Sequence, residues 1–433
     1  MIRRTLLALG TALTLGSAQA STLAFTNARI HTLGTAGTLE AATLIIRNGA
    51  VEAVGAEVAV PEGATVIDAK GKVITPGLFD AYTHLGLDEI SGVDEANDSA
   101  NRNPRYAAAL DVVDALNPHS TLLPINRIDG IALAMSAPVS EGGGPLFAGR
   151  GAVIQLGRLD ALVAKPQAAM FINLAEAGAS ASQGGRAALW LSLREALEEA
   201  KSGASSAVQR PAQLGALDVA ALQPVLSGEM PLVASVHRAA DIRTLLRFAE
   251  EYGFKPIVHG GAEAHRVAAE LAAKQVPVIL DPTLNLPERF EALAASADAA
   301  AVLHRAGVRI AFSSQGSGNG SHNSRNIRQL AGNAVAQGLP WNAALAAISL
   351  NPAAIYGMDF TLGSLEAGKQ ASFVVWDGDP LELTTAAVQV YAAGRAVPMT
   401  SRQTLLRDRY AARQKGLSGT PAATGASQSP AKR

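Results

Sequence analysis

The sequence predicts an α/β protein whose central part is a series of βα units that build a parallel sheet. The first observation is that apolar β-like runs alternate with helical segments through the middle of the chain, which is the pattern of βα units. The second is a β-rich start over residues 21–75, where Thr43–Val54 reads as two strands around an Asn48-Gly49 hairpin turn. At 433 residues the chain is long enough for more than one domain.

Seven apolar runs are candidate strands of the central sheet. They are Leu78–His84, Gly130–Met135, Ala168–Asn173, Leu232–His237, Lys255–His259, Pro277–Asp281 and Val308–Ser313. One further strand is obscured by the loop region around residues 142–144. Residues 241–252, between two of the runs, carry apolar side chains at helical spacing with charges on the other face. If the units close into a barrel, the last residues of each strand are the candidate site, because barrel sites lie at the C-terminal strand ends.

Both ends of the chain carry signals of a different kind. Residues 1–20 are predicted to be a signal peptide: a charged start, an apolar run over residues 5–16 that is too short to span a membrane, and the cleavage site Ala18-Gln19-Ala20. Residues 403–433 are predicted to form a C-terminal helix and a disordered tail. The mature chain is therefore expected to be periplasmic or secreted, without a membrane span.

Composition excludes several classes of function. The net charge is -1, so no nucleic acid or anionic membrane surface is expected as a partner. The chain contains no cysteine, which excludes disulfides and thiolate chemistry. The partners that remain are a small molecule and other protein subunits.

The most informative segment is Val73–Gly86, which reads VITPGLFDAYTHLG. Tyr82 and His84 lie two residues apart, and on a strand such side chains point the same way. Two imidazoles in these places could ligate one metal ion. The segment resembles the opening barrel strand of the amidohydrolase superfamily, whose signature is Pro-Gly-hydrophobic-hydrophobic-Asp-x-His-x-His. Tyr82 stands in the place of the first histidine, and a neutral phenol is a poor metal ligand at pH 7.

This resemblance covers nearly the whole mature chain and implies a fold. It implies a TIM-like (β/α)8 barrel over residues 76–360, beside a small composite β-sandwich built from residues 21–75 and 361–402. The segment Leu362–Asp377 is similar to the superfamily's closing motif GxLxxGKxADxVVxD, with Ser372 where that motif has aspartate. The chain most resembles the exported imidazolonepropionase-like amidohydrolases.

The fifth and sixth strands carry further departures from that group. The fifth strand of the group ends in His-x-His-Arg-Ala-x-Asp-Ile, and this chain has Ser235 at the first histidine and keeps His237. The sixth usually ends in His-Gly-Thr-Glu-Ala, and this chain reads Val258 to Ala264 as VHGGAEA. Counting back from the glutamate puts Gly260 in the ligand place, whereas one inserted residue puts His259 there. The sequence leaves both alignments open.

The eighth strand normally ends in Gly-Thr-Asp, and the resemblance makes that aspartate a metal ligand and the proton acceptor for the attacking water. Gln315 occupies this place, and an amide cannot accept a proton near neutral pH. Asp281, after the seventh strand, is the other candidate catalytic position. His322 in the downstream Ser321-His322-Asn323 could bind a polar substrate, although a solvated loop is the simpler interpretation.

The first functional hypothesis is a degenerate amidohydrolase with an intact barrel. Tyr82, Ser235 and Gln315 then mark lost ligand positions, and the usual two-metal centre is not expected. Tyr82, Ser235 and His322 would contact a small-molecule ligand in the barrel mouth. Such a protein could also act as a homo-oligomer or as the subunit of an intact homologue.

Two alternatives remain. In one, His84, His237 and His259 hold a single weakly bound zinc, since three histidines and water form a known catalytic zinc site. Asp281 or Asp80 would act as base, and family resemblance implies hydrolysis of a C–N bond in a cyclic amide or amino-acid derivative. In the other, the chain is a binding protein that uses the barrel mouth without turnover.

Overall fold

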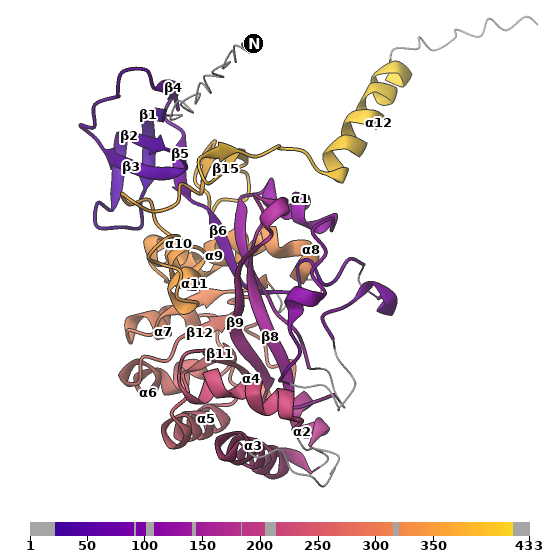
Figure 1. Cartoon of the computed structure of the whole chain (residues 1–433). Coiled ribbons are helices and arrows are strands. Elements are labelled where there is room, and N and C mark those ends of the chain that lie inside the picture. The colour runs from indigo at the N-terminus through magenta and orange to yellow at the C-terminus, as the bar shows by residue number, and fades with distance from the viewer. Residues whose placement is uncertain are drawn as a thin grey trace, which may run out of the picture.

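The computed structural model of the protein describes residues 22–90, 92–100, 108–140, 144–182, 184–203, 214–314 and 320–418. The predicted signal peptide, Gln315 and the tail beyond residue 418 lie outside this range. Two sheets, each of eight strands, organise the described chain (Figure 1). The first lies at one end of the molecule, and the second runs through its body with helices around it.

The first sheet is built from both flanks of the chain. Its strands are β1 (Thr22–His31), β2 (Thr38–Arg47), β3 (Ala50–Gly55), β4 (Thr65–Asp68), β5 (Val73–Pro76), β14 (Phe373–Trp376), β15 (Ala387–Ala392) and β16 (Arg395–Ala396). The order is β16-β15-β14-β5-β1-β2-β3, with β4 beside β1. Antiparallel pairing of β14 with β5 joins the two flanks, so the predicted composite β domain is confirmed. The Asn48-Gly49 turn is also confirmed, since both residues have the positive φ, 53° and 83°, that a two-residue hairpin favours.

The second sheet follows chain order. It comprises β6 (Leu78–Thr83), β7 (Ile131–Ser136), β8 (Phe147–Gln155), β9 (Val163–Asn173), β10 (Leu232–Val236), β11 (Pro256–Gly260), β12 (Val278–Leu280) and β13 (Ile310–Phe312). Its two edges, β6 and β13, are brought together. The Ser313 hydroxyl donates to the Tyr82 carbonyl at 2.8 Å, and the Ser314 hydroxyl donates to Asp80 at 2.7 Å. The sheet is therefore a nearly closed barrel, as predicted.

One strand departs from eight regular βα units. β8 is the strand that the sequence did not reveal, and it pairs antiparallel with both β7 and β9. The link from β8 to β9 spans only residues 156–162, with one short 3-10 turn, Leu159–Ala161. A parallel crossover needs a dozen or more residues, whereas antiparallel strands need only a short turn. The barrel thus contains a three-stranded meander where the prediction had βα units.

Helices cover the outside of the barrel (Figure 1). They are α1 (Leu122–Arg127), α2 (Glu176–Ala181), α3 (Gly185–Ser202), α4 (Ala216–Leu226), α5 (Ala239–Tyr252), α6 (Ala268–Ala273), α7 (Ala299–Arg305), α8 (Gly320–Asn323), α9 (Ile327–Ala336), α10 (Trp341–Ala347) and α11 (Leu350–Ile355). The last helix, α12 (Arg402–Ser418), extends away from the barrel beyond β15 (Figure 1). The predicted apolar face of α5 is buried: Ile242, Leu245, Leu246 and Ala249. No helix in the described ranges is long and apolar enough to cross a membrane.

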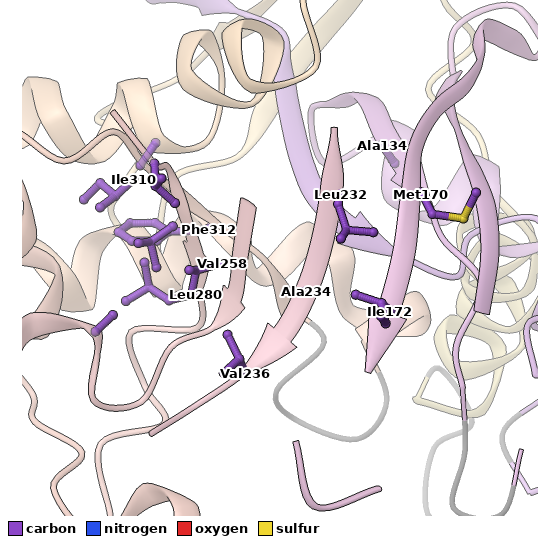
Figure 2. Close-up of a cluster of buried hydrophobic side chains, with 14 of the residues drawn as sticks. Ala134, Met170, Ile172, Leu232, Ala234, Val236, Val258, Leu280, Ile310 and Phe312 are labelled. Carbon is purple, nitrogen blue, oxygen red and sulfur yellow. The ribbon is translucent and has the colours of Figure 1, made fainter. Parts of the chain in front are cut away.

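Alternation along the strands divides the core into two layers. Side chains such as Ala234, Val258, Leu280 and Phe312 point out to the helices (Figure 2). Their neighbours, including Val233, Ile257 and Ile279, belong to a separate cluster that fills the barrel. Because side chains of a strand alternate between its two faces, Ser235 shares the inner face with Val233, and His259 shares it with Ile257. The fold therefore aims these two polar residues at the barrel interior.

Candidate active site in the barrel mouth

Ser235 and His259 lie side by side at the C-terminal ends of β10 and β11. The strands are parallel and in register at these two residues. The Ser235 hydroxyl and His259 Nδ1 form a hydrogen bond of 3.0 Å. This geometry resolves the alternative that the sequence left open: the inner-face side chain of the sixth barrel strand is that of His259, not the adjacent Gly260.

Tyr82 covers the ring of His259. The two rings are stacked, with centroids 4.0 Å apart and planes 9° from parallel. Tyr82 is 5% exposed, and its ring also makes edge contacts with His84 and Phe171 at 5.7 and 5.5 Å. Burial raises the pKa of the phenol above its usual value, so Tyr82 is neutral at every physiological pH. It fills space here as an aromatic ring.

The three histidines that the sequence singled out lie close enough to influence one another. Burial, together with the nearby His237, His84 and Arg289, lowers the pKa of His259 to about 3. Burial, with Arg289 and Arg186 nearby, lowers the pKa of His237 to about 4. Both rings are therefore neutral at pH 7. His84 Nδ1 donates to the Ala137 carbonyl at 2.7 Å, which fixes the orientation of that ring.

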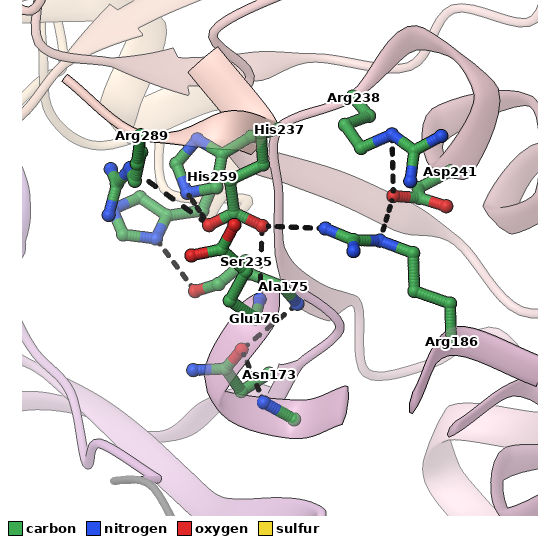
Figure 3. A network of polar contacts seen from close by, with 12 residues as sticks. Asn173, Ala175, Glu176, Arg186, Ser235, His237, Arg238, Asp241, His259 and Arg289 are labelled. Atoms are coloured by element: carbon green, nitrogen blue, oxygen red, sulfur yellow. Dashed lines mark hydrogen bonds and ion pairs between the residues drawn. The ribbon is translucent and has the colours of Figure 1, made fainter. Parts of the chain in front are cut away.

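His237 packs against the end of β11 and faces a buried carboxylate (Figure 3). A Cβ on Gly260 would lie 2.3 Å from the His237 ring, so only glycine permits this approach. His237 Nε2 lies 3.8 Å from Glu291 Oε1. Glu291 is 2% exposed and accepts hydrogen bonds from the Glu176 backbone N–H at 3.0 Å and from Arg186 Nη2 at 3.1 Å. Burial raises the pKa of Glu291 despite these partners.

Sequence reasoning missed Glu291 and Arg186. Glu291 belongs to a 3-10 turn, Phe290–Ala292, in the long loop after β12, and Arg186 comes from the start of α3. Arg186 Nε also donates to Asp241 of α5 at 2.9 Å, so one guanidinium joins two carboxylates (Figure 3). The only signal in the sequence is that Glu291 lies in a loop following a barrel strand, where functional residues gather.

Asp80 lies beneath the mouth and is fully buried. Its Oδ2 accepts hydrogen bonds from the Ser314 and Ser324 hydroxyls at 2.7 and 2.6 Å, and Oδ1 accepts one from the Tyr82 backbone N–H at 3.3 Å. Burial outweighs these bonds and raises the pKa of Asp80 to about 7. The carboxyl thus ties β6 to the segment after β13.

The remaining predicted residues lie at the same end but are not joined in one constellation. Asp281 follows β12, and its Oδ1 accepts from the Thr283 backbone and hydroxyl at 2.9 and 2.6 Å. Its Oδ2 is buried without a partner among the described residues, as is His237 Nδ1. Burial raises the pKa of Asp281. His322 lies half-buried in α8, and no described hydrogen bond links it to this group.

Comparison with known proteins identifies the family. The Amidohydrolase family profile matches residues 236–402. The crystal structure of an amidohydrolase from Thermotoga maritima MSB8 superposes with a TM-score of 0.76 at 25% identity, covering 88% of this chain and all of that one. The chain belongs to the amidohydrolase superfamily.

Two relatives of this amidohydrolase-superfamily chain have curated names. Imidazolonepropionase of Sphingopyxis alaskensis is 28% identical over 361 residues, covering 73% of this chain and 82% of that protein. Amidohydrolase tasK of Hapsidospora irregularis is 26% identical over 377 residues, covering 78% of this chain. The chain spans only 37% of the length of tasK.

The described residues of this superfamily member do not fit the metal centre that the family resemblance implies. Tyr82 offers a buried neutral phenol, and Oδ2 of Asp80 already accepts hydrogen bonds from two serine hydroxyls. No group of three or more His, Cys, Asp or Glu among the described residues is arranged to hold a metal ion. Gln315, the remaining ligand place, lies outside the described ranges.

Proposed function

We propose that this amidohydrolase-superfamily protein binds a small polar molecule in its barrel mouth and has little or no metal-dependent hydrolytic activity. The observation that carries this proposal is the stack of Tyr82 on His259. Bridged metal pairs need several anionic or imidazole ligands. At this position the chain stacks an uncharged aromatic ring on the His259 ring, where the family pattern has another imidazole.

The carboxyl groups near the barrel mouth are poorly suited to act as a general base, which supports low hydrolytic activity. A general base must lie within reach of the water it activates and must be ionised at the working pH. Asp80 is held by two serine hydroxyls inside the protein, and its pKa is near 7. Gln315 carries an amide in the place of the family's proton acceptor. The remaining candidate base, Asp281, has a raised pKa but keeps one oxygen without a described partner.

The unpartnered buried atoms favour a ligand over an empty mouth. Buried polar atoms in proteins almost always have hydrogen-bond partners. His237 Nδ1 and Asp281 Oδ2 have none among the described residues, and they offer a lone pair and a carboxylate oxygen to a polar ligand. The imidazolonepropionase relative suggests a cyclic amide or amino-acid derivative as the ligand class. Binding could serve the protein alone, as a homo-oligomer, or as the subunit of an intact homologue.

Metal content is the decisive measurement. We expect protein purified without chelator to contain well under one metal ion per chain by mass spectrometry of the elements, and added zinc to leave thermal stability unchanged. The matched comparison is the variant Tyr82→His/Ser235→His/Gln315→Asp, which restores the three ligand types. It should bind zinc more tightly than wild type if the site is a relict. Stoichiometric metal in wild type, with hydrolysis lost in His84→Ala, would overturn the proposal.

The alternative of a single zinc would need the three histidines to move closer together, because no group of three among the described residues is placed to hold a metal ion. The effect of His237 and His84 on the pKa of His259 shows that the three rings share one neighbourhood. A single zinc held by these rings, with Asp281 as the base, would make the protein a mononuclear hydrolase. The metal measurement separates this alternative from the binding function.

The protein is also proposed to be exported to the periplasm or secreted after cleavage near Ser21. The support is the charged start, the short apolar run and the Ala18-Gln19-Ala20 site. Mass spectrometry of the exported protein should find a chain that begins near Ser21, and an intact Met1 would contradict the proposal.

A further inference from the structure

A cavity lies at the end of the barrel opposite the mouth. It has a volume of 520 Å³, within the range of about 300–1,000 Å³ typical of small-molecule sites. Its walls include Pro231, Pro256, Pro277 and Arg309, which stand at or just before the starts of β10, β11, β12 and β13. Ser235 and His259 lie at the other ends of β10 and β11. The cavity is therefore separate from the candidate active site.

The cavity is rich in positive charge, in a chain whose net charge is -1. Lys165, Lys255, Lys274 and Arg309 line it, against Glu229 and Glu250. Lys274 is paired with Glu250. The exposed side chains of Lys255 and Arg309 have no hydrogen-bond or ion-pair partner among the described residues. Two cations on its wall are therefore available to an anion.

A third cation is held in place at the same wall. Lys165 is half-buried, and its Nζ donates to the Tyr356 carbonyl at 2.7 Å. Tyr356 directly follows α11, so the ammonium donates a hydrogen bond to a carbonyl that the end of the helix leaves without a partner in the helix. A Cβ on Gly357 would lie 3.4 Å from Nζ, so glycine at this position leaves that side of the ammonium uncovered. Lys165 can donate further hydrogen bonds, because an ammonium carries three protons.

The inner wall of the cavity is apolar. Leu246, Phe254, Ile257, Val276 and Tyr356 are buried beneath it, and Ala354 and Ile355 add partly exposed apolar surface. An inorganic anion alone would leave this surface without a partner. A ligand with an apolar body and one anionic group matches both parts of the lining.

We infer that this cavity binds a small organic anion, a carboxylate or phosphate ester on a ring or short alkyl body, held by Arg309, Lys255 and Lys165. The guanidinium of Arg309 suits either group, because its planar set of donors pairs with two oxygens at once. The inference does not depend on the function of the barrel mouth.

The test is a titration of the full-length mature protein with four probes, followed by saturation-transfer NMR. Benzoate and phenyl phosphate carry both parts of the predicted ligand, and benzamide carries the ring alone. Inorganic phosphate carries the charge alone and, having no C–H proton to observe, is added as a competitor of the aromatic probes. We expect saturable binding of benzoate or phenyl phosphate, with both competing for one site and benzamide binding more weakly. Whichever of these two probes binds more tightly shows whether the site prefers a carboxylate or a phosphate ester.

Variants locate the site. Arg309→Gln should weaken the better probe roughly tenfold, as expected for a lost hydrogen bond to a charged group, and Lys255→Gln should weaken it further. Arg305→Gln is the matched control, an exposed arginine on α7 outside the cavity lining. His237→Ala reports on the barrel mouth. Failure of both anionic probes to bind, or binding that responds to His237→Ala and not to Arg309→Gln, would overturn the inference.

Discussion

Replacing Asp80 with asparagine should change how the stability of the protein depends on pH. Asp80 is fully buried, and burial raises its pKa from 3.8 to about 7. The folded protein therefore holds a proton on Asp80 up to about pH 7, while the unfolded chain releases it near pH 4. Since the folded state binds more protons in this window, the stability that Asp80 contributes falls as pH rises. Asparagine cannot ionise, so Asp80→Asn loses this dependence.

The size of the effect follows from the shift. With a folded pKa of about 7 and an unfolded pKa of 3.8, linkage gives a loss of roughly 2–3 kcal/mol in the wild type between pH 5 and pH 8. Asparagine keeps the shape of the side chain, and its altered bonds to Ser314 and Ser324 add an offset that does not vary with pH. The free energy of unfolding of the variant, minus that of the wild type, should therefore rise by roughly 2–3 kcal/mol over the same range.

Urea denaturation at pH 5, 6, 7 and 8 measures this difference directly. Subtracting wild type from variant cancels the titration of the buried histidines, which is common to both. Asp68→Asn is the control: Asp68 is exposed and its pKa is lowered, so its difference from wild type should be flat between pH 5 and 8. A flat difference for Asp80→Asn as well would mean that the serine hydroxyls hold Asp80 ionised, and the reasoning would be wrong.

Two further predictions concern the rings in the mouth. Tyr82→Ala should lower the free energy of unfolding by about 3–5 kcal/mol, because it removes a buried ring that touches three others. Tyr82→Phe should lower it by roughly 1 kcal/mol or less, because among the described residues the hydroxyl makes only one long hydrogen bond, of 3.4 Å. Equal losses for the two variants in chemical denaturation would argue against stacking. The pKa of His259 is about 3, so its contribution to stability is present above pH 6.5 and is lost as pH falls toward 3, by about 1.4 kcal/mol per pH unit. His259→Asn should remove that share of the acid sensitivity, and an unchanged slope between pH 6.5 and 4.5 would show that His259 is solvated.

Most barrel strands could be predicted because each is a compact apolar run between turn signals. β8 could not, because of the glycines it contains. Gly149 and Gly151 lie inside it, and glycine weakens strand propensity. Gly151 is nevertheless required there, since a Cβ would lie 2.4 Å from the Phe171 ring. A residue that lets two strands approach closely thus looks, in the sequence, like part of a loop.

The candidate site was predictable only where it lies on strands. The two-residue period along β6 and the register of β10 with β11 place Tyr82, Ser235 and His259 together. Glu291 and Arg186 reach the same region from a loop and a helix separated by more than 100 residues, and no local pattern links such positions. The choice between His259 and Gly260 likewise needed the register of the strand, which a single inserted residue inverts.

The structure also changes how the missing ligands should be counted. In the sequence, Tyr82, Ser235 and Gln315 are three separate departures from the family pattern. In the fold, two of these three residues contact His259: Tyr82 stacks on its ring, and Ser235 is hydrogen-bonded to its Nδ1.

A neutral His259 inside the barrel needs a partner for its Nδ1 and contact for its face, and these two residues supply both. The departures from the family pattern at Tyr82 and Ser235 are therefore linked, because both residues contact the same neutral histidine, and they do not count as two independent losses of metal ligands. Reverting Tyr82 alone would leave Ser235 holding His259 in its present orientation, which is why the restoring variant must change both residues before zinc affinity can be expected to rise.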